Sequence, residues 1–311
     1  MLKLSDAWVW DSWYIKHEGL HHAFYLKASR ALGDPNRRHR NPVIGHSVSN
    51  DLKNWTELED AVAVGEQGEW DSWTTWTGSV TQDLNGLWWM FYTGTSREDG
   101  GDIQRIGAAT SLDLISWSKV VGNPLVEADP EIYEQLDYDL WHDQAWRDPW
   151  VFRHGEKWHM LITARTNAEA PKFDKGVVGH AISADLKVWE SMPPISSPGG
   201  FGQLEVVQTV IVNGYPTLVW CCGPAELSDR VRIEHPTGGM FSVTGESLLG
   251  PFDVSKALWF PHETLYAARL VEHEGQWFLI GFIDGAVTGE FGGYLCDPIP
   301  VTNRGSGIEP L

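Results

Sequence analysis

This chain of 311 residues has few cysteines and little positive charge. Of its three cysteines, Cys221 and Cys222 are adjacent on an expected strand, where neighbouring side chains point to opposite faces. We therefore expect no disulfide framework, which favours a reducing compartment. The 23 Lys and Arg against 42 Asp and Glu leave a net charge of -19. This charge argues against nucleic acid and membrane partners, because both normally bind through basic patches.

Long apolar runs are also missing. No run approaches the roughly 18 residues that a membrane-spanning helix needs. The opening residues, Met1 to Trp8, lack the charged, apolar and small-residue regions of a secretory signal. We therefore expect a soluble cytoplasmic protein. The twelve His are scattered without metal-ligand spacing, so the sequence predicts no metal site and no cofactor, and nothing in it indicates an oligomeric state.

A turn glycine followed by an apolar and aromatic strand occurs five times. These repeat glycines are Gly19, Gly86, Gly155, Gly214 and Gly275, with spacings of 67, 69, 59 and 61 residues by subtraction. Copies of this length, with short aromatic-rich strands and turn residues between them, favour a β-propeller over a helical solenoid. The sequence therefore predicts an all-β fold, a five-bladed β-propeller, as a single domain over residues 1–311.

A second repeated element, Ser-x-Asp-Leu-x-x-Trp, supports this prediction. It occurs three times and ends at Trp55, Trp117 and Trp189. The Ser and Asp side chains are suited to bond nearby backbone amides in a tight turn. We expect the Leu and Trp to pack between blades rather than to contact a ligand.

Three acidic residues occupy nearly the same place in three of the five repeats. Asp11 lies eight residues before its repeat glycine, Asp148 seven before and Glu205 nine before. Because the innermost strand of each propeller blade runs beside the central axis, residues at equivalent places converge in one funnel. We therefore expect these three carboxylates to be neighbours.

Carboxylates that face each other across a sugar are the usual machinery of glycoside hydrolysis, and a third can tune a pKa or stabilise positive charge. Aromatic rings with polar edges stack on sugars, which makes the Trp residues near the first acids candidate sugar-binding residues. Gln208 is a further candidate, for binding a hydroxyl. The tryptophan candidates are Trp10, Trp13, Trp73 and Trp76.

The residues around these acids also carry a family resemblance. The segment from Trp8 to Trp13, with sequence WVWDSW, resembles the nucleophile motif of family 68 fructosyltransferases and, more loosely, that of family 32 β-fructosidases. Trp146-Arg147-Asp148-Pro149 resembles the Arg-Asp-Pro motif of both families, and Trp76-Thr77-Gly78-Ser79 is similar to their Ser-Gly-Ser region. Glu205 stands where those families place the general acid, without the Cys-Pro or Arg-Pro that usually follows.

The resemblance implies a role for each acid. Asp11 would be the nucleophile, Glu205 the general acid/base, and Asp148 a transition-state stabiliser beside Arg147, in a retaining mechanism. It also adds Ser79 and Arg147 to the candidate substrate-binding residues. The expected substrate is an oligosaccharide or glycoside.

Three hypotheses follow. The first is a glycoside hydrolase that releases terminal β-fructofuranosyl units from small oligosaccharides or conjugates, with transfer to a sugar hydroxyl as a close variant. The second is an inverting arabinofuranosidase or xylosidase similar to family 43, which shares the fold and the acid trio. A retaining carboxyl pair is about 5 to 5.5 Å apart and an inverting pair roughly 6.5 to 9.5 Å. The third is a non-catalytic lectin, which the restriction of the acids to three repeats disfavours.

Overall fold

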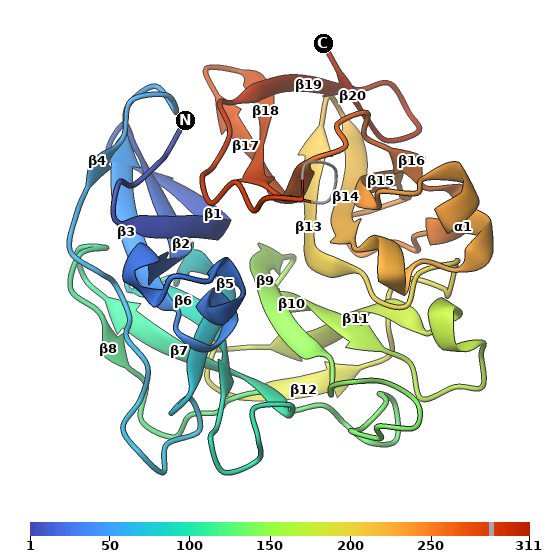
Figure 1. Ribbon diagram of the computed structural model, residues 1–311, viewed down its shortest axis with the longest axis horizontal. Coiled ribbons are helices and arrows are strands. Elements are labelled where there is room, and N and C mark those ends of the chain that lie inside the picture. The colour runs from blue at the N-terminus through green and yellow to red at the C-terminus, as the bar shows by residue number, and fades with distance from the viewer. Residues whose placement is uncertain (286–288) are drawn as a thin grey trace.

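The computed structural model describes residues 1–285 and 289–311, which form five four-stranded antiparallel sheets arranged around a central axis (Figure 1). Each sheet is one blade, and its four strands follow one another in the chain from the innermost strand to the outermost. The predicted all-β fold, a five-bladed β-propeller, is confirmed. Among the described residues, no helix is long and apolar enough to cross a membrane.

The strands divide evenly among the blades. Blade 1 holds β1 (Ala7–His17), β2 (Leu20–Ser29), β3 (Val43–Ser49) and β4 (Thr56–Glu57). Blade 2 holds β5 (Thr74–Gln82), β6 (Trp88–Thr95), β7 (Gln104–Ser111) and β8 (Ser118–Lys119), and blade 3 holds β9 (Trp146–His154), β10 (Lys157–Arg165), β11 (Gly176–Ser183) and β12 (Trp189–Met192). Blade 4 holds β13 (Glu205–Val212), β14 (Tyr215–Cys222), β15 (Gly239–Thr244) and β16 (Leu258–Trp259), and blade 5 holds β17 (Leu265–His273), β18 (Gln276–Ile283), β19 (Ile299–Asn303) and β20 (Ile308–Pro310).

Helices are short and lie in the connections. The one α-helix among the described residues is α1 (Asp229–Glu234). The 3-10 helices are η1 (Arg30–Leu32), η2 (Pro35–Arg40), η3 (Lys172–Asp174), η4 (Pro224–Glu226) and η5 (Val254–Lys256).

Each repeat glycine lies in the hairpin between the first and second strands of its blade. Its φ is positive in every case, for example +83° at Gly19 and +89° at Gly86, a conformation that glycine adopts without steric cost. The strands that follow supply much of the core, and β6 is buried at every one of its eight positions. The repeated sequence pattern therefore corresponds to one blade per copy.

The Ser-x-Asp-Leu-x-x-Trp elements form the expected turns. In the first copy, the Asp51 carboxylate accepts bonds from the backbone N–H groups of Lys53 (2.9 Å) and Asn54 (2.8 Å). In all three copies the Trp indole N–H donates to the backbone carbonyl of the Leu. The ring of Trp117 meets Phe24 of the preceding blade at 5.6 Å, so this tryptophan packs between blades as predicted.

A β-bulge interrupts the innermost strand of every blade at nearly the same level. The strand pairing shifts between Val9 and Ser12 in β1, between Trp76 and Gly78 in β5, and at corresponding places in β9, β13 and β17. A bulge bends its strand and re-aims the side chains beside it, and bulges are common next to active sites. Three bulge residues have positive φ, namely Asp148 (60°), Val206 (55°) and Ala267 (46°).

Candidate active site

Residues near the five bulges line one axial cavity of about 400 Å³. Each blade contributes to its wall a residue just before the bulge or within it. Those that line the cavity are Trp10 and Asp11 from β1, Trp76 and Thr77 from β5, Arg147 and Asp148 from β9, Glu205 and Val206 from β13, and Tyr266 from β17.

The three predicted acids meet in this cavity, although Asp11 and Glu205 are 194 positions apart by subtraction. They lie within the innermost strands rather than before them. Asp11 and Asp148 occupy the bulges of their blades. Glu205 stands one position earlier, at the place that Arg147 takes in blade 3. The expected convergence is confirmed, and its structural cause is the bulge.

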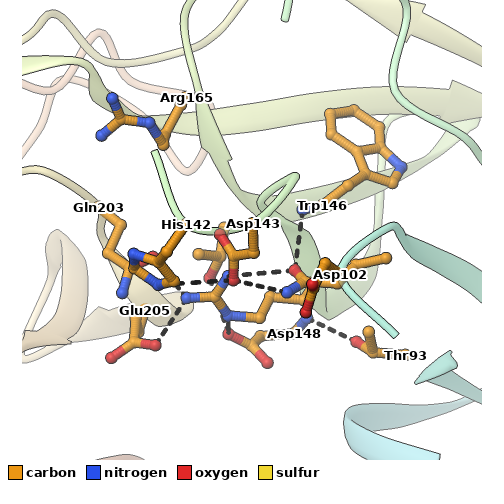
Figure 2. Close-up of polar contacts among 12 residues, drawn as sticks. Thr93, Asp102, His142, Asp143, Trp146, Asp148, Arg165, Gln203 and Glu205 are labelled. Carbon is orange, nitrogen blue, oxygen red and sulfur yellow. Dashed lines mark hydrogen bonds and ion pairs between the residues drawn. The ribbon is translucent and has the colours of Figure 1, made fainter. Parts of the chain in front are cut away.

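Arg147 links the acids of blades 3 and 4. Its Nη2 donates to Glu205 Oε1 (2.7 Å) and to Gln203 Oε1 (2.5 Å), and its Nη1 lies 3.3 Å from Asp143 Oδ2 (Figure 2). Its Nε lies 3.5 Å from Asp148 Oδ2. Burial alone would lower the pKa of Arg147, but the three carboxylates raise it above its ordinary value. Arg147 is therefore a fixed cation that holds Glu205 in place.

Several hydrogen bonds hold Asp148 in the wall of the cavity. Its Oδ2 accepts bonds from the Thr163 hydroxyl (2.9 Å) and from the backbone N–H of Val206 (3.2 Å), and its own N–H donates to Thr93 Oγ1 (2.9 Å). The residue is 3% exposed. Burial raises its pKa above the usual range, and the nearby Arg147 cation opposes that shift. These bonds fix the direction of the carboxyl group.

Asp11 is half-buried and accepts a hydrogen bond from the Thr77 hydroxyl through Oδ2. Burial raises its pKa to about 7, and the charge of Asp148 adds to the shift while the Thr77 hydroxyl opposes it. The Asp11 carboxyl is consequently ionised only above about pH 7. The bond from Thr77 fixes the direction of this carboxyl group at the cavity wall.

Glu205 is held through both of its oxygens. Tyr266 donates its hydroxyl to Oε2 at 2.5 Å, and Arg147 binds Oε1. Burial and the neighbouring Glu205 charge raise the pKa of Tyr266 well above its usual value, so the phenol keeps its proton and remains a donor.

Sequence reasoning missed Thr77 and Tyr266. Both lie nine residues before their repeat glycines (86 − 77 and 275 − 266), which is also the step that finds Glu205. The same step therefore marks polar residues in blades 2 and 5 as well as the acid of blade 4. A position-by-position comparison of all five copies would have found both polar residues.

Three of the predicted substrate-binding residues line the cavity, namely Trp10, Trp76 and Arg147. Trp10 is 3% exposed. The indole N–H of Trp76 donates to the backbone carbonyl of His39 (2.9 Å), which fixes this ring at the cavity wall.

The other two tryptophan candidates do not line the cavity. Trp13 is fully buried and stacks on Phe24 with ring centroids 6.4 Å apart, so no sugar can reach it. Trp73 does not line the cavity, because its ring packs against the guanidinium groups of Arg40 (4.6 Å) and Arg97 (5.5 Å).

The predictions for Ser79 and Gln208 are wrong, because both side chains are buried and bond the backbone of a neighbouring blade. The Ser79 hydroxyl is fully buried and accepts the backbone N–H of Val151 (3.0 Å), which joins blade 2 to blade 3. Gln208 is 2% exposed and bonds both the N–H (2.7 Å) and the carbonyl (3.1 Å) of Leu270, which joins blade 4 to blade 5.

Comparison with known proteins identifies the family. The model of the glycosyl hydrolases family 32 N-terminal domain matches residues 12–287. The chain belongs to glycosyl hydrolase family 32.

The chain is also similar to curated proteins and to solved structures. The chain is 28% identical over 197 residues to the β-fructofuranosidase insoluble isoenzyme CWINV5 of Arabidopsis thaliana, covering 61% of this chain and 31% of that protein. It thus spans about a third of the length of such relatives. The inulosucrase from Halalkalicoccus jeotgali bound to kestose has a TM-score of 0.77 at 21% identity, covering 99% of this chain and 90% of that chain. A Bombyx mori GH32 β-fructofuranosidase variant in complex with sucrose has a TM-score of 0.74 at 19% identity, covering 100% and 64%. These structures show the same fold.

Proposed function

We propose that this protein hydrolyses the glycosidic bond of terminal β-fructofuranosyl units in small oligosaccharides or conjugates, with retention of configuration. The observation that carries the proposal is the convergence of Asp11, Asp148 and Glu205 on one cavity in a member of family 32. The names of its relatives support the choice of sugar, because the curated match is a β-fructofuranosidase and one similar structure holds sucrose.

In the first step, Glu205 gives a proton to the oxygen of the leaving group while Asp11 attacks the anomeric carbon. Thr77 binds one oxygen of Asp11 and so fixes the direction of the attacking carboxyl group. As Glu205 loses its proton, negative charge develops on its carboxylate. The donors Arg147 and Tyr266 already face that carboxylate, so they stabilise the charge without rearrangement.

In the second step, the Glu205 carboxylate takes a proton from water, and the resulting nucleophile attacks the anomeric carbon and releases Asp11. A sugar hydroxyl in place of water gives transfer instead of hydrolysis. Both steps pass through a transition state with positive charge on the ring. Asp148 supplies a fixed carboxylate beneath that charge, because Thr163 and Val206 hold its direction.

The test is hydrolysis of sucrose, short inulin and levan oligosaccharides, and aryl arabinofuranoside and xyloside, by the wild type and by Asp11→Asn and Glu205→Gln. We expect fructose release that either substitution reduces by at least about 1,000-fold, the scale for loss of a nucleophile or acid that acts as part of a unit. Transfer to methanol should give the methyl β-fructofuranoside, as retention requires. Pentose release or an inverted product would favour the family 43-like alternative, against which the family 32 match argues. Sugar binding without turnover, unchanged in Asp11→Asn, would favour the lectin.

A further inference from the structure

Two loops form the side of the cavity next to Glu205. One is the segment before β9, which contributes His142 and Asp143, and the other is η4 after β14, which contributes Glu226. In the proposed function, the group that Glu205 protonates is the leaving group, so this side of the cavity receives it. Neither Asp143 nor Glu226 was singled out by the sequence.

Asp143 offers a buried acceptor that the protein leaves unused. Its Oδ2 receives bonds from the Gln104 amide (2.8 Å) and from Arg147 (3.3 Å). Its Oδ1 is buried and has no hydrogen-bond partner among the described residues. This oxygen has almost no accessible surface, so a ligand hydroxyl can bond it only after a neighbouring side chain shifts, whereas the negative charge of the carboxylate acts on any group in the cavity.

Glu226 lies in η4, partly buried, on the same side as Glu205. Its carboxyl is near Gly223, and the hydroxyl of Tyr266 approaches the same glycine. Burial raises the pKa of Glu226 to about 7, and repulsion from Glu205 adds to that shift. At pH 8 this carboxyl carries a negative charge close to the acid/base.

Charges on the described cavity wall are strongly unbalanced. Six acids line the cavity, namely Asp11, Asp143, Asp148, Glu205, Glu226 and Asp284. Arginine is present there only as Arg38 and Arg147, and lysine is absent from the described wall. Arg147 is already bound by three carboxylates.

Arg38 does not offset this charge on the leaving-group side. It comes from η2 of blade 1, its guanidinium packs 3.7 Å from the centre of the Phe291 ring, and it donates to the Pro35 carbonyl (3.0 Å). The charges that act on Arg38 are those of Asp11, Asp284 and Asp34. An anionic group next to Glu226 would therefore meet carboxylates first, because the cation of the described wall without an ion pair, Arg38, lies beside other acids.

We propose that Asp143 and Glu226 select the leaving group, accepting an uncharged sugar through its hydroxyls and rejecting one that carries a phosphate. This inference rests on the proposed function, because that function identifies which side of the cavity receives the leaving group. Carboxylates accept hydroxyl donors, and a phosphate dianion beside them is repelled. At a separation of roughly 7 Å and an effective dielectric constant of about 40, each repulsive charge pair weakens binding about tenfold.

The experiment compares sucrose with sucrose that carries a phosphate on its glucose ring, at pH 8 and low salt. We expect the wild type to have a kcat/KM at least about tenfold higher for sucrose. Glu226→Lys should lower this ratio by about tenfold or more, and Glu226→Gln by less. Asp143→Asn should lower it as well. Glu156→Lys makes the same charge change on an exposed hairpin away from the cavity, and should leave the ratio unchanged.

Calorimetric binding to Asp11→Asn separates the two proposals, since it requires no turnover. Weaker binding of the phosphorylated sugar, relieved when Glu226→Lys is added, supports the selection even if the wild type proves inactive. Inactivity on all fructosides would overturn the proposed function alone. Equal or tighter binding of the phosphorylated sugar to Asp11→Asn would overturn the selection, whatever the wild type hydrolyses.

Discussion

Substitution of Asp11 should stabilise the protein while it destroys activity. The folded cavity raises the pKa of Asp11 from 3.8 to about 7, so the native state holds this proton more tightly than the unfolded chain does. The stability that Asp11 contributes is fully present below about pH 4 and is lost as the pH rises through 7.

The size of the effect can be worked out from the same shift. A difference of about three pKa units at 1.36 kcal/mol per unit gives a penalty of about 4 kcal/mol above pH 7. At pH 5 the protein has lost only about 1.5 kcal/mol of this stability, because the loss begins at the unfolded pKa of 3.8 and has proceeded only as far as pH 5. Asp11→Asn removes the titrating group, and its amide oxygen can still accept the hydrogen bond from Thr77.

Urea unfolding of both proteins at pH 4, 5, 6, 7 and 8 measures this difference. The free energy of unfolding of the variant should almost equal that of the wild type at pH 4. The difference in favour of the variant should then grow steadily to a plateau near pH 7 to 8. Asp6→Asn removes a charge from an exposed side chain and serves as the control, with a small difference at every pH. A stability difference for Asp11→Asn that does not change with pH would refute the reasoning, since it would show that Asp11 is not protonated on folding.

Three further predictions rest on named contacts. The kcat/KM of the wild type should fall about tenfold per pH unit below pH 7, because the nucleophile must be ionised. The hydrogen bond from Thr77 lowers the pKa of Asp11, so its loss in Thr77→Val should raise that pKa and move the acidic limb of the profile to higher pH. A limb that stays in place would contradict the role of the hydroxyl. Tyr266→Phe removes one donor to the acid/base and should lower kcat/KM by about 100-fold on the wild-type substrate, with folding checked by circular dichroism. Glu134→Gln breaks the buried ion pair with Arg165 (2.6 Å) and should lower the free energy of unfolding by about 3 to 5 kcal/mol, as urea titration would show; a loss below about 1 kcal/mol would show that Arg165 is satisfied without it.

Local sequence patterns determined the architecture. The repeat glycines mark hairpins that need positive φ, and each Ser-x-Asp-Leu-x-x-Trp turn is built from hydrogen bonds within a few residues. Such features depend on the neighbouring chain alone, so the blade count could be predicted from them. The three acids could be predicted as well, since steps of seven to nine residues back from three of the repeat glycines lead to the axis.

The pairing of those acids with their polar neighbours could not be predicted in this way, although the step of nine residues before Gly275 leads to Tyr266 itself. Tyr266 bonds Glu205 across 61 positions of the chain, and Gln203 meets Arg147 across 56. Nothing in the local sequence records either pairing. These contacts exist only because the ring of blades brings the innermost strands together.

The tryptophan candidates for sugar binding also show that the sequence did not reveal which side chains face the axis. Trp10 and Trp13 are three residues apart in one strand, yet only Trp10 lines the cavity while Trp13 packs in the core. Residues three apart in a regular strand already point to opposite faces, but the bulge between Val9 and Ser12 shifts that alternation, so only the pairing register reveals which side chain faces the axis. The sequence by itself determined the number of blades and the blades that carry acids. The tertiary structure decided which side chains face the axis, because a bulge and a distant neighbour, rather than residue type, set the direction and the partners of each one.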